Sequence, residues 1–297
     1  MEGPRYGSAA AFKQALEQRL KDLGDLDRRR QLLVYDRFLA RATIALGDAV
    51  TLKGGLGLEI RLRRARTTRD VDLRMAGSSN HLLLRLQALG RLDLGDFMSF
   101  EIEPHKDHPV VAGDGVRYHG QRFTVRCALV RREYGRPFGL DIGFADPMLG
   151  PPDRIAAADV LAFAGIPPPV LQVYPVVTHI AEKLHAYTLP RPIGINSRLK
   201  DLPDIALLGS TGELLAVHVS AALTQTFGFR ATHAIPTRFP DPPKEWLDRY
   251  RRMASDDRLP WPTLPAVTTA ARDFLEPVLS GLREAKWSST HWAWHAS

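Results

Sequence analysis

The stretch Leu52–Met75 reads LKGGLGLEIRLRRARTTRDVDLRM and joins two adjacent glycines, six arginines and an Asp-x-Asp pair within one short span. Its pattern predicts a short strand at Val50–Lys53, a helical turn or helix over LGLEIRL, and a second strand over RDVDLRM. Gly54 and Gly55 then lie between strand and helix, where glycine permits a tight turn and brings backbone N–H groups close to an anion. Such a pair is also a common structural turn, so by itself it leaves both interpretations open.

Asp70 and Asp72 are the candidate metal ligands of this stretch. In a strand, residues two apart lie on one face about 7 Å from each other, which leaves Val71 for the core. Two carboxylates repel unless a cation lies between them, and Mg²⁺ prefers a few carboxylates together with phosphate oxygens. The pair therefore predicts a Mg²⁺ site that handles a nucleotide triphosphate. The alternative is a solvated strand face on which the acids pair with neighbouring arginines.

A third acid lies in the segment PFGLDIGFADP, residues 137–147. Strand alternation predicts a buried face and leaves Asp141 on the other face among the smallest residues. The residues expected to be buried are Phe138, Leu140, Ile142 and Phe144, and those beside Asp141 are Gly139, Gly143 and Ala145. If this strand neighbours the Asp70 strand, three carboxylates meet, and Asp141 activates an attacking hydroxyl or completes the metal shell. The alternative is that Asp141 points to water.

The composition is that of an ordinary soluble globular protein. The chain has 297 residues, of which 44% are apolar and 25% charged, and its length allows two small domains or one large one. No apolar run approaches the roughly 20 residues of a membrane-spanning helix, and the N-terminus lacks the features of a signal peptide. We therefore expect no membrane partner and a cytoplasmic location. The single cysteine, Cys127, excludes an internal disulfide and a multi-cysteine metal site.

The net charge of +7 favours phosphate-rich partners, because positive surface raises their local concentration. Five basic residues fall within the nine positions RLRRARTTR, directly beside the two acids. This clustering strengthens the expectation of a nucleotide or nucleic-acid partner over that of a generally basic surface.

The periodicity of the chain predicts two domains of different class. The first, residues 1–155, is expected to hold a mixed, mostly antiparallel sheet with flanking helices, and the second, residues 156–297, to be helical. The first half shows helical patterns at 12–23, 27–46 and 80–90 and strand patterns at 97–103, 119–130 and 137–145. The second half shows helical patterns at 176–188, 202–208, 214–227, 244–254 and 265–282. The aromatic end WSSTHWAWHAS either docks on the body or meets a partner.

Lys183 lies on the helix expected over Val176–Thr188, at the edge of its buried stripe. A lysine beside a cleft neutralises triphosphate charge as a transition state develops, and the alternative is a surface lysine. Asp201 and Asp204 open the next helix, either as functional acids or as an N-cap and first turn. His185 is expected to pack or to hydrogen-bond rather than to act as a general base.

Taken in order, a helix pair, LKGG, RTTRDVDL, a later strand acid, AEKLHA and RLKDLPDI resemble the AbiEii/AbiGii nucleotidyltransferase toxins, which include the mycobacterial MenT-type toxins. The resemblance covers the chain from about Asp27 to Leu208. It implies an α+β fold, with a nucleotidyltransferase-like mixed sheet and flanking helices followed by a helical C-terminal region. It also implies a toxin encoded beside a cognate antitoxin protein.

The resemblance assigns roles to individual positions. The family's metal-binding acid pair matches Asp70 and Asp72, its Lys-Leu-His motif contains Lys183, and its later acid matches Asp204. The catalytic residues expected are Asp70, Asp72, Lys183, Asp204 and Asp141. The nucleotide-binding residues expected are Lys53, Gly54, Gly55, Arg66, Thr68 and Arg69. Leu56 departs from the family pattern, in which a serine commonly follows the two glycines.

These observations predict a Mg²⁺-dependent nucleotidyltransferase that takes an NTP as donor. The resemblance implies an RNA acceptor, with the 3′ end of tRNA favoured, whose modification would block charging and translation. One alternative is a nucleotidyltransferase that acts on a protein hydroxyl. Another is a non-catalytic RNA-binding module with structural acids, and the lack of interleaved aromatic patches counts against it.

Overall fold

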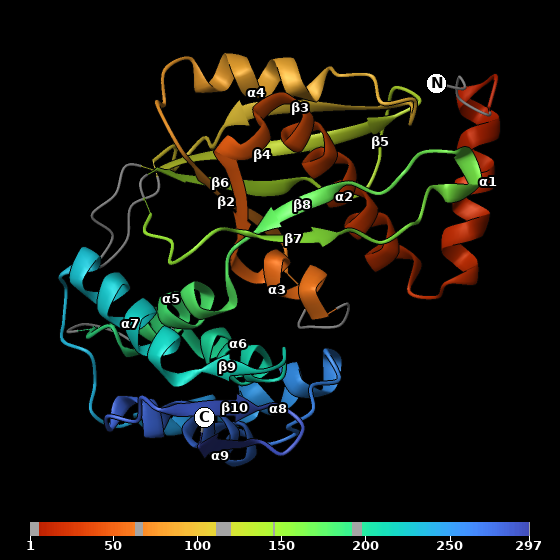
Figure 1. Ribbon diagram of the computed structural model, residues 1–297. Helices are drawn as coiled ribbons and strands as arrows, with labels where there is room; N and C mark the ends of the chain where they lie inside the picture. The colour runs from red at the N-terminus through yellow and green to blue at the C-terminus, as the bar shows by residue number, and fades with distance from the viewer. Residues whose placement is uncertain (1–5, 63–67, 111–119, 145, 192–197, 297) are drawn as a thin grey trace.

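The computed structural model describes residues 6–62, 68–110, 120–144, 146–191 and 198–296. A sheet covered by helices forms one half of the molecule, and the helices that follow it in sequence form the other half (Figure 1). The predicted α+β class, with a mixed sheet followed by a helical region, is confirmed. None of the helices in these ranges combines the length and apolar character needed to cross a membrane.

The large sheet is mixed, with the strand order β3-β4-β6-β2-β1-β8-β7 and β5 paired to β4. Its strands are β1 (Val50–Lys53), β2 (Asp70–Met75), β3 (Met98–Pro104), β4 (Gly120–Leu129), β5 (Arg132–Glu133), β6 (Phe138–Phe144), β7 (Asp153–Ala156) and β8 (Val170–Val173). The pairs β2–β6 and β1–β8 are parallel, and the other pairs are antiparallel. This order places the strand of the acid pair between the strands of Lys53 and Asp141.

Helices pack on this sheet through apolar stripes. The helices of this half are α1 (Ala9–Asp22), α2 (Leu26–Leu46), α3 (Gly54–Leu62) and α4 (Leu82–Gly90). Phe12 and Leu20 belong to one buried stripe of α1. Tyr35 and Phe38 of α2 meet the ring of Phe138 edge-on, with centroid separations of 5.1 and 5.5 Å. These contacts form the core beneath the sheet.

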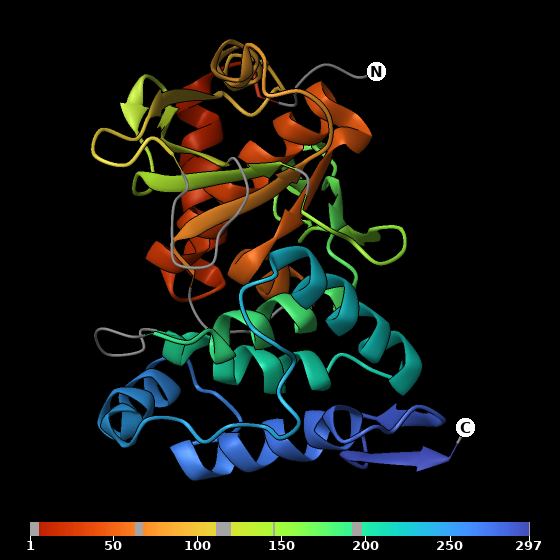
Figure 2. The ribbon, with the colours of Figure 1, turned by 90° about the vertical axis from the view of Figure 1, so that its left-hand side faces the viewer.

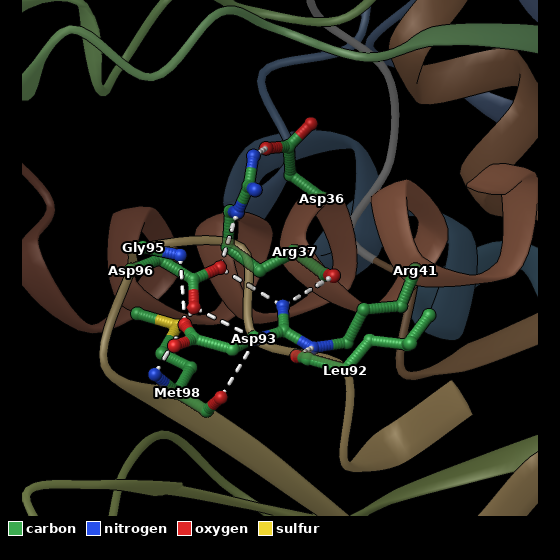
Figure 3. Close-up of polar contacts among 8 residues, drawn as sticks. All are labelled: Asp36, Arg37, Arg41, Leu92, Asp93, Gly95, Asp96 and Met98. Carbon is green, nitrogen blue, oxygen red and sulfur yellow. Dashed lines mark hydrogen bonds and ion pairs between the residues drawn. The ribbon is translucent and has the colours of Figure 1, made fainter. Parts of the chain in front are cut away.

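A buried ion cluster ties α2 to the loop before β3 (Figure 3). Arg41 donates two hydrogen bonds to the Asp96 carboxylate, at 2.9 and 2.7 Å, and Arg37 donates a third at 2.8 Å. Arg41 also donates to the carbonyl of Met98 at 2.7 Å. Burial alone would raise the pKa of Asp96, but the hydrogen bonds from Arg41 and Arg37 hold it below its usual value. The cluster satisfies charges that would otherwise be costly in the core.

The second half has its own apolar core. Its helices are α5 (Val176–Thr188), α6 (Asp201–Gly209), α7 (Ala216–Arg230), α8 (Leu247–Asp256) and α9 (Leu264–Leu279). Ile180 and Leu184, on the predicted stripe of α5, are fully buried. Figure 2 shows these helices as layers below the sheet, with α3 lying between the two halves.

Several strands were not predicted from the sequence. In the first sheet these are β5, β7 and β8, and β8 follows residue 155 yet pairs with β1. In the C-terminal region a small sheet joins β9 (Leu214–Leu215) to β10 (Ala285–Ser288) and β11 (Ala293–Ala296). The helix expected from residue 214 therefore begins at Ala216, because β9 precedes it. The proposed division at residues 155 and 156 stays a prediction.

Candidate active site

Four charged residues form a row across four neighbouring strands. Strand pairing places Lys53 of β1 opposite Asp72 of β2, Asp72 opposite Asp141 of β6, and Asp141 opposite Arg122 of β4. Directly paired residues project from the same face of a sheet, so the row places two neighbouring acids between two cations along one face. Asp70, two residues before Asp72, shares that face.

Two glycines make room for the carboxylates. A Cβ atom on Gly54 would lie 2.0 Å from Oδ2 of Asp72, and Gly54 also has a φ of +66°, which only glycine adopts readily. A Cβ atom on Gly139, the residue opposite Asp70, would lie 2.6 Å from Oδ1 of that acid. The glycine turn therefore holds the backbone directly against the acid pair, and this position admits no other residue without a shift.

A cavity of about 550 Å³ opens beside this row. Its acidic residues are Asp70, Asp72, Asp141 and Asp201, and its basic ones are Arg69, Arg122, Lys183, Arg198, Lys200 and His105. Gly54, Gly55 and Thr68 also line it. The sheet thus supplies one wall, while α5 and the segment 198–201 supply basic groups from the other half. Such a cavity suits a ligand that carries both phosphates and a cation.

Asp141 is held by Arg122 in a bidentate pair. The Nε and Nη2 groups of Arg122 donate to its two carboxylate oxygens at 2.7 and 2.6 Å. These hydrogen bonds raise the pKa of Arg122 above its usual value. Asp141 therefore faces a guanidinium rather than water, and both of its oxygens are engaged.

Lys183 points between two acids of α6. Its Nζ lies 2.9 Å from Oδ1 of Asp201 and 2.8 Å from Oδ2 of Asp204. Asp201 lines the cavity, whereas Asp204 is fully buried and is not among the described lining residues. The N-cap residue of α6 is Lys200 and not Asp201, whereas Asp201 and Asp204 both lie in the first turn, as the structural alternative expected. Both acids also pair with Lys183 of α5.

The remaining nucleotide-binding candidates are spread around the cavity. Thr68 and Arg69 line it, and the carbonyl of Thr68 accepts a hydrogen bond from Arg28 at 3.0 Å. Lys53 is buried instead, and its ammonium group pairs with Asp146. Arg66 lies outside the described residues, as does Ala145.

The family model described as "Nucleotidyl transferase AbiEii toxin, Type IV TA system" matches residues 37–276. The chain belongs to this AbiEii family. It is a nucleotidyltransferase toxin of a type IV toxin–antitoxin system, and an antitoxin partner follows from that membership.

A solved structure of one nucleotidyltransferase toxin shares the overall fold of this chain. MenT4, a nucleotidyltransferase toxin from Mycobacterium tuberculosis, superposes with a TM-score of 0.55 at 15% identity, covering 96% of this chain and 92% of its own. JHP933 from Helicobacter pylori matches with a TM-score of 0.44 at 16% identity, covering 83% of this chain and 94% of its own. No curated protein sequence matches the chain significantly. At these identities the likeness concerns the fold alone.

The AbiEii acid pair fits a hard divalent cation with few protein ligands. Burial raises the pKa of Asp72 to about 6, and the charges of Asp141 and Asp70 oppose its ionisation further, although Lys53 favours it. In the described ranges no three His, Cys, Asp or Glu side chains are arranged to hold a metal. Oxygen donors from Asp70 and Asp72 alone suit Mg²⁺, which takes its other ligands from phosphates and water.

Several residues of this AbiEii site escaped the sequence analysis. Arg122 and His105 line the cavity, but only strand pairing brings them there. Arg198 and Lys200 had a signal in the quoted motif RLKDLPDI, which singled out the acids and not the basic residues. The prediction for His185 is confirmed, since it hydrogen-bonds Thr232 at 2.8 Å and burial lowers its pKa to about 4.

Proposed function

We propose that this AbiEii-family toxin is a Mg²⁺-dependent nucleotidyltransferase that transfers a nucleotide from an NTP to the 3′ end of tRNA. A modified 3′ end cannot accept an amino acid, so translation stops. The observation that carries the proposal is the single cavity in which Asp70 and Asp72 face Lys183, Arg198 and Lys200. Carboxylates that can hold a metal and cations that can hold phosphates thus share one site.

Asp70 and Asp72 hold the Mg²⁺ in this proposal, and the ion neutralises phosphate charge when bound. The turn at Gly54 and Gly55 brings backbone N–H groups to the triphosphate, and Thr68 and Arg69 contact it from the entry to β2. Lys53 stays beneath this turn and supports the charge of Asp72.

Lys183 stabilises the negative charge that develops on the triphosphate. Asp204 acts through Lys183, because its buried carboxylate fixes the ammonium group at the cavity wall. Asp141 serves as a base or as a metal ligand, and because Arg122 occupies one lone pair on each of its oxygens, it does so through the remaining lone pairs or after Arg122 releases a hydrogen bond. Until then the pair keeps the acid oriented.

An RNA acceptor is supported by the basic character of the chain. The net charge is +7, and Arg69, Arg122, Arg198 and Lys200 surround the cavity that would receive a 3′ end. Phosphate contacts from such residues supply sequence-independent affinity. The tRNA and the NTP would both be met in the cytoplasm.

Nucleotide transfer tests the proposal directly. Purified protein is incubated with total tRNA, Mg²⁺ and each labelled NTP in turn, beside the double variant Asp70→Ala/Asp72→Ala. We expect RNase-sensitive label with at least one NTP, at least 10³-fold weaker in the variant and absent after chelation of Mg²⁺. The matched control, Asp159→Ala/Asp248→Ala, removes two exposed acids and should label tRNA normally.

Other outcomes would replace the proposal. Label that survives RNase and migrates with protein would identify a protein hydroxyl as the acceptor. Binding of tRNA without transfer of any NTP, unchanged in the Asp70/Asp72 variant, would indicate an RNA-binding module.

A further inference from the structure

A closed ring of ion pairs joins the two halves of the molecule behind the candidate site. Arg230 donates from Nη2 to Oδ1 of Asp146 at 3.1 Å and to Oε1 of Glu182 at 2.8 Å. Lys53 completes the ring, since its Nζ hydrogen-bonds Asp146 and lies 4.0 Å from Oε2 of Glu182. We call Lys53, Asp146, Glu182 and Arg230 the junction network.

The members of the junction network come from four separate segments. Lys53 ends β1, Asp146 follows β6, Glu182 lies on α5, and Arg230 ends α7. Two belong to the sheet half and two to the helical half, so the ring spans the boundary between the two apolar cores. Arg74 of β2 strengthens the sheet side by donating to the carbonyl of Asp146 at 2.7 Å.

The junction network is buried, which makes its geometry exacting. The side chains of Asp146, Arg230, Lys53 and Glu182 are 0%, 8%, 9% and 17% exposed. Burial alone would raise the pKa of Glu182, but Lys53 and Arg230 hold it below its usual value. Buried charges lose solvation, and a well-packed apolar cluster can be equally stable. A contribution to stability therefore does not explain the charged ring. A better explanation is that its hydrogen bonds permit only one arrangement of α5 and α7 relative to the sheet.

Both ends of the junction network are next to residues of the cavity. Lys53 lies directly opposite Asp72 in the strand pairing and precedes Gly54 in the chain. Glu182 immediately precedes Lys183, which lines the opposite wall. Whatever fixes Glu182 relative to Lys53 therefore fixes Lys183 relative to the acid pair.

We propose that Asp146 and Arg230 are positioning residues that set the separation between Lys183 on α5 and the carboxylates Asp70 and Asp72 on β2. The inference rests on the proposed function, because it assigns the network a part in the same transfer reaction. Small misplacements of a charge-stabilising group lower kcat strongly, while the ground-state contacts of the substrate are less affected.

Variants of Arg230 test this role in the full-length protein with NTP, tRNA and Mg²⁺. We expect Arg230→Met to lower kcat about 10²-fold with KM for the NTP changed less than about threefold. Arg230→Lys keeps one charged contact and should recover at least about tenfold of that loss. If Arg230→Met does not fold, kcat and KM for the NTP are measured instead for Arg230→Lys and Glu182→Gln. Each of these variants should show a smaller loss of kcat.

A matched control separates positioning from stability. Arg37→Met breaks a comparable buried Arg–Asp pair, which joins α2 to Asp96 in the loop before β3 (Figure 3), and neither residue is among those lining the cavity. It should lower the melting temperature as Arg230→Met does and leave kcat within about twofold of the original. A kcat of Arg230→Met equal to that of Arg37→Met at comparable stability would overturn the inference.

A double-mutant cycle shows whether Arg230 acts through Lys183. If it does, Arg230→Met should cost little further kcat in a Lys183→Met background. If the fold-losses of kcat in the two single variants multiply in the double variant, Arg230 and Lys183 act independently, which would contradict the proposal.

Hydrogen exchange distinguishes failure of the positioning role from failure of the proposed function. Even if the protein transfers no nucleotide to any acceptor, Arg230→Met should speed amide exchange in α5 and β1 more than in α2. Faster exchange in a protein that transfers no nucleotide would support the role of Arg230 in holding α5 against β1 and would contradict the proposed transfer reaction. Unchanged exchange in α5 would reject the inference itself.

Discussion

At the residue scale, Asp36 carries the charge least suited to its surroundings. It lies on α2 beside the Arg37–Arg41–Asp96 cluster (Figure 3). Its Oδ1 has no hydrogen-bond partner in the described ranges, and its Oδ2 is 3.7 Å from Arg37. Burial raises the pKa of Asp36 to about 7, with a further contribution from Asp96, although Arg37 opposes the rise.

Replacement of this carboxyl should stabilise the protein at alkaline pH. Between pH 4 and 7 folded Asp36 keeps a proton that the unfolded chain has lost, so stability falls as pH rises through this window. We expect Asp36→Asn to raise the free energy of unfolding by about 1–3 kcal/mol at pH 8. The gain should shrink steadily towards pH 5 in urea titrations. Asp22→Asn, at an exposed site, serves as the control, and a less stable Asp36→Asn at pH 8 would contradict the argument.

At the element scale, the C-terminal hairpin is part of the folded body. Trp287 of β10 is fully buried and donates to the carbonyl of Gly209 at 2.7 Å. Trp294 of β11, directly opposite it, donates to the carbonyl of Phe274 at 2.8 Å. The hairpin thus covers the end of α6, where it satisfies the carbonyl of Gly209, and packs along α9. The sequence had left open whether this end docks on the body, and it does.

Truncation of the buried tryptophan should be costly. Trp287→Ala removes a large side chain from the second core and leaves a carbonyl unsatisfied, so we expect a loss of about 3–5 kcal/mol in chemical unfolding. His295→Ala, exposed on the same hairpin, should change stability by less than about 0.5 kcal/mol. Equal effects of the two variants would mean that the hairpin does not support the core.

At the scale of the whole molecule, α3 connects the two cores. Leu56 packs in the core of the sheet half, and Leu58, two residues later, packs in the core of the helical half. Both side chains are buried. Together with the junction network, this helix should make the two halves unfold in one transition.

Loss of Leu58 should uncouple the halves. All five tryptophans lie beyond residue 240, so their fluorescence reports the helical half, and alkylation of buried Cys127 in β4 reports the sheet half. In urea the two probes should give one midpoint for the original chain and separate midpoints for Leu58→Ala. The control is Leu20→Ala, whose side chain is also fully buried but lies within the sheet core. It should lower the free energy of unfolding by about 2–5 kcal/mol and shift the midpoints of both probes together. Equal midpoints from the two probes in Leu58→Ala would contradict the role of Leu58 in coupling the two halves.

Local patterns were enough to predict much of the fold. The bounds of α5, Val176–Thr188, match the sequence prediction because the helical periodicity of its buried residues is carried by the segment itself. Val71 is buried between the two acids because strand alternation is carried by its segment in the same way. The bounds of β1, Val50–Lys53, match as well, although its four residues are all buried and do not alternate. Strands β5, β7 and β8 escaped prediction, since segments of two to four residues carry too few positions for a clear periodic signal.

By itself, the sequence determined that Asp70 and Asp72 share one strand face beside a glycine turn, because neighbours in the chain are held together by backbone geometry alone. Only the tertiary structure decided that Arg122 engages Asp141 and that Arg230 reaches Asp146, 84 residues away. Strand register and the docking of α7 bring these charges together. Register and docking depend on the packing of whole elements, and no local pattern of residues encodes which distant charge a side chain will meet.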